Sequence, residues 1–153
     1  MSLFYLTPRP SFEENPKLAK ASHNLSSLLD AIRVKKIPAA TESQINEIVT
    51  GVNNFLDPDP QLIKQITSAQ SAILKLIENE LGIVSKNYYQ LQWLALGMAA
   101  FGIPLGVTFG AALGNMAFLG IGLPIGMAIG IAVGTSKDKQ AQEERRQLDW
   151  TAK

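Results

Sequence analysis

The segment from Asn87 to Ser136 holds 50 consecutive residues without a formal charge. As one α-helix with a rise of about 1.5 Å per residue, it would extend about 75 Å. The hydrocarbon core of a bilayer is only about 30 Å thick and takes about 20 residues per crossing. A charge-free segment of this length therefore predicts two membrane-spanning helices joined as a hairpin.

Glycine recurs at every fourth position in two series inside this segment. Residues four apart lie on one face of a helix, and small residues there let helix backbones approach closely in lipid. We therefore expect the two series to be helix-packing faces. They could close one hairpin on itself, but we favour packing between subunits, in a homo-oligomer. The series are Gly102, Gly106, Gly110, Gly114 and Gly122, Gly126, Gly130, Gly134.

A turn is expected to divide the segment into its two spans. Gly114 and Asn115 both tolerate left-handed backbone angles and have no charged neighbour. A turn at these residues gives spans of about 91–113 and 116–135.

The flanks of the hairpin carry the residue types that lie at membrane surfaces. Aromatic side chains precede the first span, and lysines flank both ends while the turn has none. The positive-inside rule then places both termini in the cytoplasm. The predicted interface residues are Tyr88, Tyr89, Trp93, Lys86 and Lys137.

A five-residue motif occurs once in each span. Gly102-Ile103-Pro104-Leu105-Gly106 recurs as Gly122-Leu123-Pro124-Ile125-Gly126, which puts Pro104 and Pro124 at the same depth from the turn. Proline removes a helical hydrogen bond and kinks the helix, and a carbonyl freed within a membrane must be buried in protein or face water. The kinks therefore either shape helix packing or form a constriction in a ring of subunits, to which Thr108 adds a hydroxyl group.

The rest of the chain reads as three amphipathic helices followed by the hairpin and a charged tail. Apolar residues recur at spacings of three and four before residue 86, and Thr41 fits a capping box that opens the second helix. The sequence thus predicts an all-α membrane protein. Its domains would be a cytoplasmic helical domain over 1–86, the transmembrane hairpin over 87–136 and a charged cytoplasmic tail over 137–153.

Side chains that carry out chemistry are scarce. The spans hold no ionisable residue, the chain has no cysteine, and its single histidine, His23, cannot build a zinc site. A net charge of +1 gives no case for nucleic-acid binding. We therefore predict no catalytic, cofactor-binding or metal-binding residues, and no enzyme activity.

Residues 97–135, with their fourfold glycine spacing, resemble the glycine-zipper hairpins of small bacterial membrane proteins. The resemblance implies membrane insertion and self-association. We expect the chain in a bacterial inner membrane, with both termini in the cytoplasm. The expected function is a homo-oligomeric pore or channel whose cytoplasmic helices gate or sense. The alternative is a non-catalytic scaffold or accessory subunit of a larger membrane complex. The expected partners are membrane lipid, further copies of the chain and a protein held by the cytoplasmic helices.

Overall fold

The computed structural model describes residues 2–56 and 59–152. These residues form helices and connecting segments, with no β-strand among them, so the all-helical prediction is confirmed for the described chain. The helices are α1 (Ser11–Glu14), α2 (Pro16–Arg33), α3 (Ala39–Asn53), α4 (Asp59–Leu81), α5 (Tyr88–Gly97), the π-helical turn η1 (Met98–Gly102), α6 (Ile103–Ala112), the 3-10 turn η2 (Met116–Phe118) and α7 (Leu119–Glu143).

The chain divides into two compact units. The helical unit comprises Met1–Ser85 together with Leu148–Lys153, and the hairpin unit comprises Lys86–Gln147. The first part of the predicted tail over 137–153 thus groups with the hairpin unit, and its last residues group with the helical unit.

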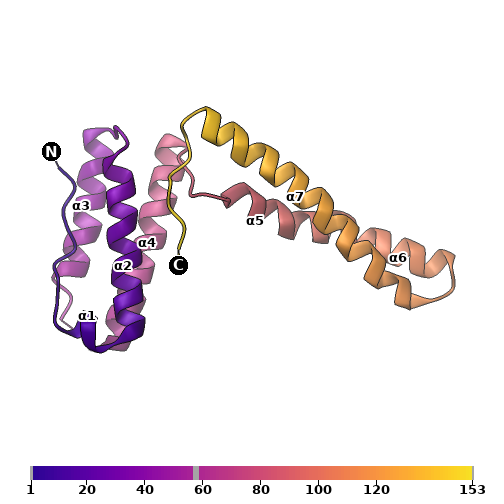
Figure 1. The fold of residues 1–153 in the computed structure, drawn as a ribbon, viewed down its shortest axis with the longest axis horizontal. Helices are drawn as coiled ribbons and strands as arrows, with labels where there is room; N and C mark the ends of the chain where they lie inside the picture. Colours follow the sequence, from indigo (N-terminus) through magenta and orange to yellow (C-terminus); the bar gives the residue numbers. More distant parts are fainter. Residues whose placement is uncertain (1, 57–58, 153) are drawn as a thin grey trace. The chain divides into compact units, whose positions relative to one another are not determined.

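The helical unit is built from α2, α3 and α4, which lie side by side (Figure 1). The apolar stripes of the three helices meet in one core, because each stripe repeats at the helical period and faces the other two. The fully buried side chains from these helices include Leu18, Leu25, Leu28, Ile32, Ile45, Val49, Ile66 and Ile73.

The start of α2 has the side-chain cap that its sequence predicts, whereas the start of α3 does not. Asn15 accepts a hydrogen bond from the Lys17 N–H at the start of α2, as an N-cap before a proline should. The capping box predicted at Thr41 is wrong, because α3 begins at Ala39 and the buried Thr41 hydroxyl donates to Glu80 Oε2 at 2.6 Å. Pro38 fixes the backbone before α3 and moves the helix start ahead of the threonine.

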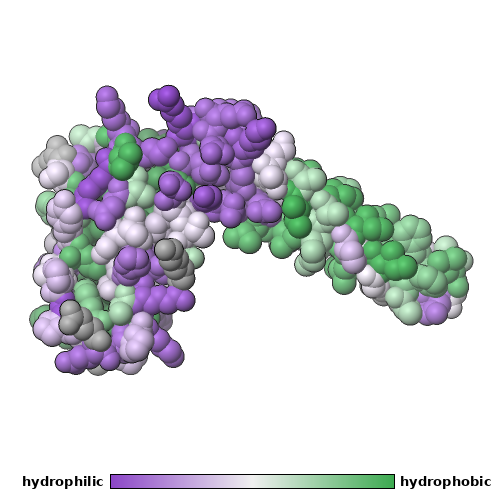
Figure 2. Space-filling model, viewed as in Figure 1, coloured by the Kyte–Doolittle hydropathy of each residue, from purple (hydrophilic) through white to green (hydrophobic). Residues whose placement is uncertain are grey.

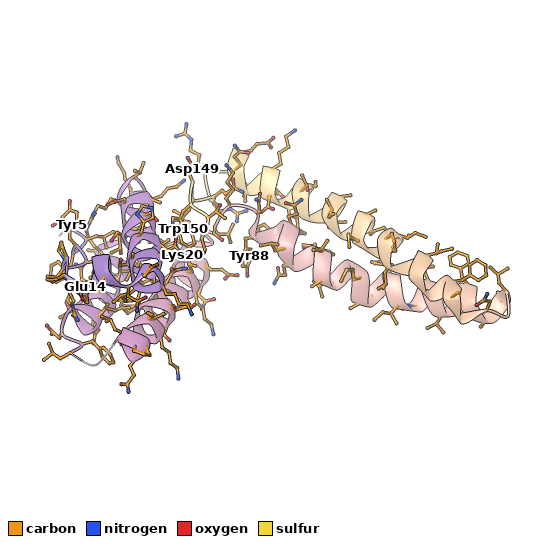
Figure 3. All side chains as sticks on the ribbon, turned by 60° about the horizontal axis from the view of Figure 1, so that its bottom comes forward. Tyr5, Glu14, Lys20, Tyr88, Asp149 and Trp150 are labelled. Carbon is orange, nitrogen blue, oxygen red and sulfur yellow. The ribbon has the colours of Figure 1, made fainter. Side chains whose placement is uncertain are left out.

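The last residues of the chain complete the helical core. Leu148 and Trp150 are both buried, and the Trp150 indole Nε1–H donates to Ser27 Oγ at 3.0 Å (Figure 3). The Leu148 N–H donates to the Val84 carbonyl at 2.8 Å. The chain therefore leaves the helical unit after Ser85 and returns to it at Leu148.

In the hairpin unit, α5, η1 and α6 form one arm and α7 forms the other (Figure 1). The arms are joined where we predicted the turn. Gly114 has φ +67°, and the Asn115 N–H donates to the Gly110 carbonyl at 3.0 Å, which is a Schellman closure of α6. The helices begin and end elsewhere than the predicted spans, because α5 starts at Tyr88 and α7 continues through the lysine-containing segment to Glu143.

Candidate functional site: the glycine interface of the hairpin

Glycines occupy every buried position among the described side chains of residues 91–135. Most large apolar side chains on the two arms are exposed, from 36% at Ile131 to 67% at Leu91, and others, such as Leu94 and Leu105, are half-buried. The two arms therefore meet through backbone atoms rather than through interlocking side chains. We call this contact the glycine interface, and its buried members are Gly97, Gly102, Gly106, Gly110, Gly122, Gly126, Gly130 and Gly134.

The backbones of the arms touch along most of α7. A Cβ atom added at Gly122 would lie 2.6 Å from the Cα atom of Gly106, and one added at Gly126 would lie 2.6 Å from the Cα atom of Gly102. Towards the open end of the hairpin, a Cβ atom at Gly130 would lie 3.0 Å from the Cα atom of Leu94. Real Cβ atoms do not approach other atoms this closely, so alanine at Gly122 or Gly126 would force the arms apart.

The π-helical turn η1 aligns Gly97 with the rest of its arm. Gly97 and Gly102 are five residues apart, and five residues of α-helix would leave them on different faces. In η1 the Ile103 N–H donates to the carbonyl of Met98, five residues earlier, so one wide turn absorbs the extra residue. Gly97 does not follow from the four-residue spacing of the other glycines, because it precedes Gly102 by five positions.

Gly114 lies outside the glycine interface, although we had placed it in the first packing series. It is exposed, and a Cβ atom there would meet no other described part of the chain within 4 Å. Its role is the left-handed conformation of the turn, which ends the series at Gly110.

The two prolines lie on the outer surface of the hairpin. Pro104 stands in the first turn of α6, directly after η1, and Pro124 lies inside α7; both are exposed. The exposed Thr108 hydroxyl donates to the Pro104 carbonyl at 2.8 Å, within its own helix. Neither proline takes part in the contact between the arms.

The predicted interface residues gather at the open end of the hairpin. The rings of Tyr88 and Tyr89 pack edge to face with centroids 5.3 Å apart, and Lys137 Nζ lies 5.6 Å from the centre of the Trp93 ring. Lys86 is exposed just before α5. This end therefore combines aromatic rings with cationic groups, as membrane-surface belts do.

Asp138 is a second feature of this end that the sequence analysis missed. Its side chain is 7% exposed, and its carboxylate accepts hydrogen bonds from the N–H groups of Tyr89 at 3.1 Å and Gln90 at 2.9 Å. These N–H groups open α5, whose own N-cap residue, Asn87, provides no side-chain hydrogen bond. An anionic group at a helix N-terminus is stabilising, so Asp138 caps α5 from the opposite arm.

The four-residue spacing could have revealed Asp138. It follows Gly134 by four positions and thus continues the series of the second arm on the same face. Where the series would continue with a glycine, the chain has an aspartate, whose carboxylate accepts hydrogen bonds from the N–H groups that open α5.

Two helices of the described chain are long and apolar enough to cross a membrane, Tyr88–Ala112 and Gly120–Glu143. Only 22% of the most apolar window of each is buried within the protein, unlike the core helix of a soluble domain. Figure 2 shows mostly hydrophobic residues on the visible face of the two arms toward the turn, whereas hydrophilic residues gather at the open end of the hairpin.

Within the described residues, no group of three or more carboxylate and histidine side chains could hold a metal ion. No protein-family model, curated protein or solved structure matches the chain.

Proposed function

We propose that this chain is a membrane-anchored, non-catalytic scaffold. The observation that carries the proposal is the glycine interface, because it closes the hairpin from within and leaves most of the large apolar side chains of the two arms exposed. Lipid tails are the solvent that such a surface fits. The helical unit would then be held at the membrane surface to bind a partner protein.

The path of the chain supports an even number of crossings. The chain leaves the helical unit after Ser85 and returns to it at Leu148, so both ends of the hairpin start from one folded body. Lys86, Lys137 and Lys139 lie at this end, which supports a cytoplasmic location for it by the positive-inside rule. With the likeness to bacterial hairpins, this argument favours a bacterial inner membrane.

Cysteine labelling tests the anchor, since the chain has no native cysteine. Leu56→Cys places a thiol at a position that is 93% exposed in the helical unit, and Asn115→Cys places one at the turn. In intact cells a membrane-impermeant maleimide should label only Asn115→Cys. Labelling of both thiols from the same side, or extraction of the protein from membranes by carbonate, would contradict the anchor.

A homo-oligomeric pore is the second candidate, favoured by the outward position of Pro104, Pro124 and Thr108. Several hairpins could place these residues around a path between subunits. Reconstituted wild-type protein would then produce discrete currents that change in Pro104→Ala and Pro124→Ala while the oligomer keeps its mass. A membrane-inserted protein that stays electrically silent would leave the scaffold as the function.

A further inference from the structure

The segment Ser2–Arg9 lies along α3 in the helical unit (Figure 1) and is held mainly through its main chain. Asn46 accepts a hydrogen bond from the Phe4 N–H at 2.7 Å and donates one to the Ser2 carbonyl at 3.2 Å. Asn53 repeats this pattern with the next part of the segment. It accepts from the Thr7 N–H at 2.9 Å and donates to the Tyr5 carbonyl at 3.0 Å.

Each asparagine thus binds the N–H of one residue and the carbonyl of the residue two positions earlier. The two asparagines are seven residues apart, which is about 10.5 Å along an α-helix. The two groups that they bind are shifted by three residues, which is about 10 Å along an extended chain. We call Asn46 and Asn53 the asparagine clasp, because the pair matches the repeat of an extended backbone.

Two arginine side chains add further contacts, one from α2 to the main chain of the segment and one from the segment to α3. The Arg33 guanidinium on α2 donates to the carbonyls of Leu3 at 3.1 Å and Phe4 at 2.9 Å. Arg9 donates to carbonyls at the C-terminal end of α3, including that of Asn53 at 2.6 Å, which satisfies groups that a helix end leaves without intrahelical partners.

The side chains of the segment contribute unequally. Leu3 is 4% exposed and belongs to the helical core, whereas Phe4 and Tyr5 are 52% and 73% exposed. Tyr5 covers the Arg33 guanidinium at 3.6 Å and lies at the edge of the helical unit (Figure 3). The segment is therefore held through its main chain, through the buried Leu3 and through Leu6, which packs against the core, while Phe4 and Tyr5 stay largely exposed.

Open cavities flank the segment on both sides. One of about 610 Å³ is lined by Leu3, Tyr5 and Arg33, and one of about 690 Å³ by Phe4, Asn46 and neighbouring residues of α3. Other side chains than Phe4 and Tyr5 would fit at these positions.

We propose that the asparagine clasp is a peptide-binding site for an extended segment of a partner protein that carries leucine at the position of Leu3. The chain's own Ser2–Thr7 occupies the site as a competing ligand. Main-chain recognition is transferable, since any extended segment presents the same N–H and carbonyl groups. This inference rests on the proposed scaffold function, because it names the class of partner that the helical unit holds.

The test uses the full chain in detergent and a fluorescent peptide with the sequence of Ser2–Pro10. Phe4→Pro with Thr7→Pro removes from the chain's own segment the two N–H groups that the clasp binds, and leaves α3 unchanged. This variant should bind the peptide at least about tenfold more tightly than the wild type does, since a site occupied in nine of ten molecules loses about tenfold in apparent affinity.

The peptide itself provides matched controls. N-methylation at Phe4 or at Thr7 should abolish binding, whereas N-methylation at Leu6, whose amide bonds neither asparagine, should preserve it. Asn46→Leu with Asn53→Leu, introduced into the double-proline variant, should also abolish binding of the peptide. A natively helical double-proline variant that fails to bind the peptide would overturn the proposal.

A second measurement covers the case in which the double-proline variant does not fold. In the wild type, excess peptide should speed hydrogen exchange at the Phe4 and Thr7 amides, and the peptide methylated at Phe4 should not. Unchanged hydrogen exchange at these amides would overturn the proposal. A second contrary result would be a wild-type dimer in which each copy binds Ser2–Thr7 of the other and which becomes a monomer in the double-proline variant. All these measurements are made in detergent, so their outcome does not depend on whether the hairpin anchors the protein in a membrane. A negative result would overturn the peptide-binding site and leave the proposed anchor untouched.

Discussion

Gly134 on α7 lies so close to Gln90 on α5 that a Cβ atom added at position 134 would stand 2.5 Å from the Cα atom of Gln90. Four residues further along the same helix, Asp138 binds the N–H of the same Gln90. Backbone contact and helix capping therefore act together at the open end of the hairpin.

Gly126→Ala should destabilise the hairpin by about 1–3 kcal/mol, because the added methyl group would meet backbone atoms that cannot move aside. The measurement is the helical unfolding transition in detergent, followed by circular dichroism. Gly120→Ala is the matched control, since a Cβ atom there meets, apart from its own helix backbone and chain neighbours, no described atom within 4 Å. Equal stability of the two variants would show that the arms do not touch at Gly126.

Deletion of Ala99 should be tolerated to within about 1 kcal/mol. It reduces the spacing between Gly97 and Gly102 from five to four, so a regular α-helix replaces η1 and both glycines keep their common face. Deletion of Val107 is the control, because it leaves Gly106 and Gly110 three apart and rotates one part of the arm by about 100°. If the two deletions lower the unfolding transition equally, η1 does not serve to align Gly97.

Asp138→Ala should cost about 1–2 kcal/mol, because two N–H groups at the start of α5 lose their acceptor. Hydrogen exchange at the Tyr89 and Gln90 amides should become faster.

Glu144→Ala is the control for this substitution. Glu144 is an exposed carboxylate whose pKa is lowered by hydrogen bonds from Arg146 and Gln140. Arg146 also bonds the Tyr89 side chain, but the N–H groups of Tyr89 and Gln90 donate to Asp138 and not to Glu144. The substitution should leave exchange at the start of α5 unchanged. If hydrogen exchange at the Tyr89 and Gln90 amides is as slow in Asp138→Ala as in the wild type, Asp138 does not cap α5.

Trp150→Ala should destabilise the helical unit by about 3–5 kcal/mol, because a large side chain that is 7% exposed leaves the core. Ser27→Ala removes only the hydrogen bond to the indole and should cost about 1 kcal/mol. Thermal unfolding of both variants makes the comparison. A tryptophan variant no less stable than the serine variant would place Trp150 outside the core.

Those parts of the fold that depend on local periodicity could be predicted from the sequence. The helical stripes around Leu25 and Ile66, the charge-free hairpin and the turn at Gly114 all follow from residues that are near one another in the chain. In the glycine interface, the four-residue spacing identified Gly102 and Gly126, which lie opposite each other.

The remaining features depend on contacts between distant residues. Asp138 meets α5 across 48 and 49 positions of sequence, and Asn46 meets Phe4 across 42. Such pairs join a side chain to a backbone group. Because nearly all residue types have the same backbone groups, the sequence does not indicate which residue is the partner. Gly97 could not be predicted for a different reason. The π-helical turn η1 changes the spacing of the packing glycines from four residues to five.

The return of Trp150 to Ser27, 123 residues earlier, has a consequence for biosynthesis. The core of the helical unit cannot be completed on the ribosome until the whole hairpin has been made and the chain beyond Leu148 has emerged. Closing so long a loop slows folding. Under the proposed anchor, the charge-free segment would enter the membrane before the first domain is finished. A chain truncated after Ser136 would leave that domain without its last core residues, Leu148 and Trp150.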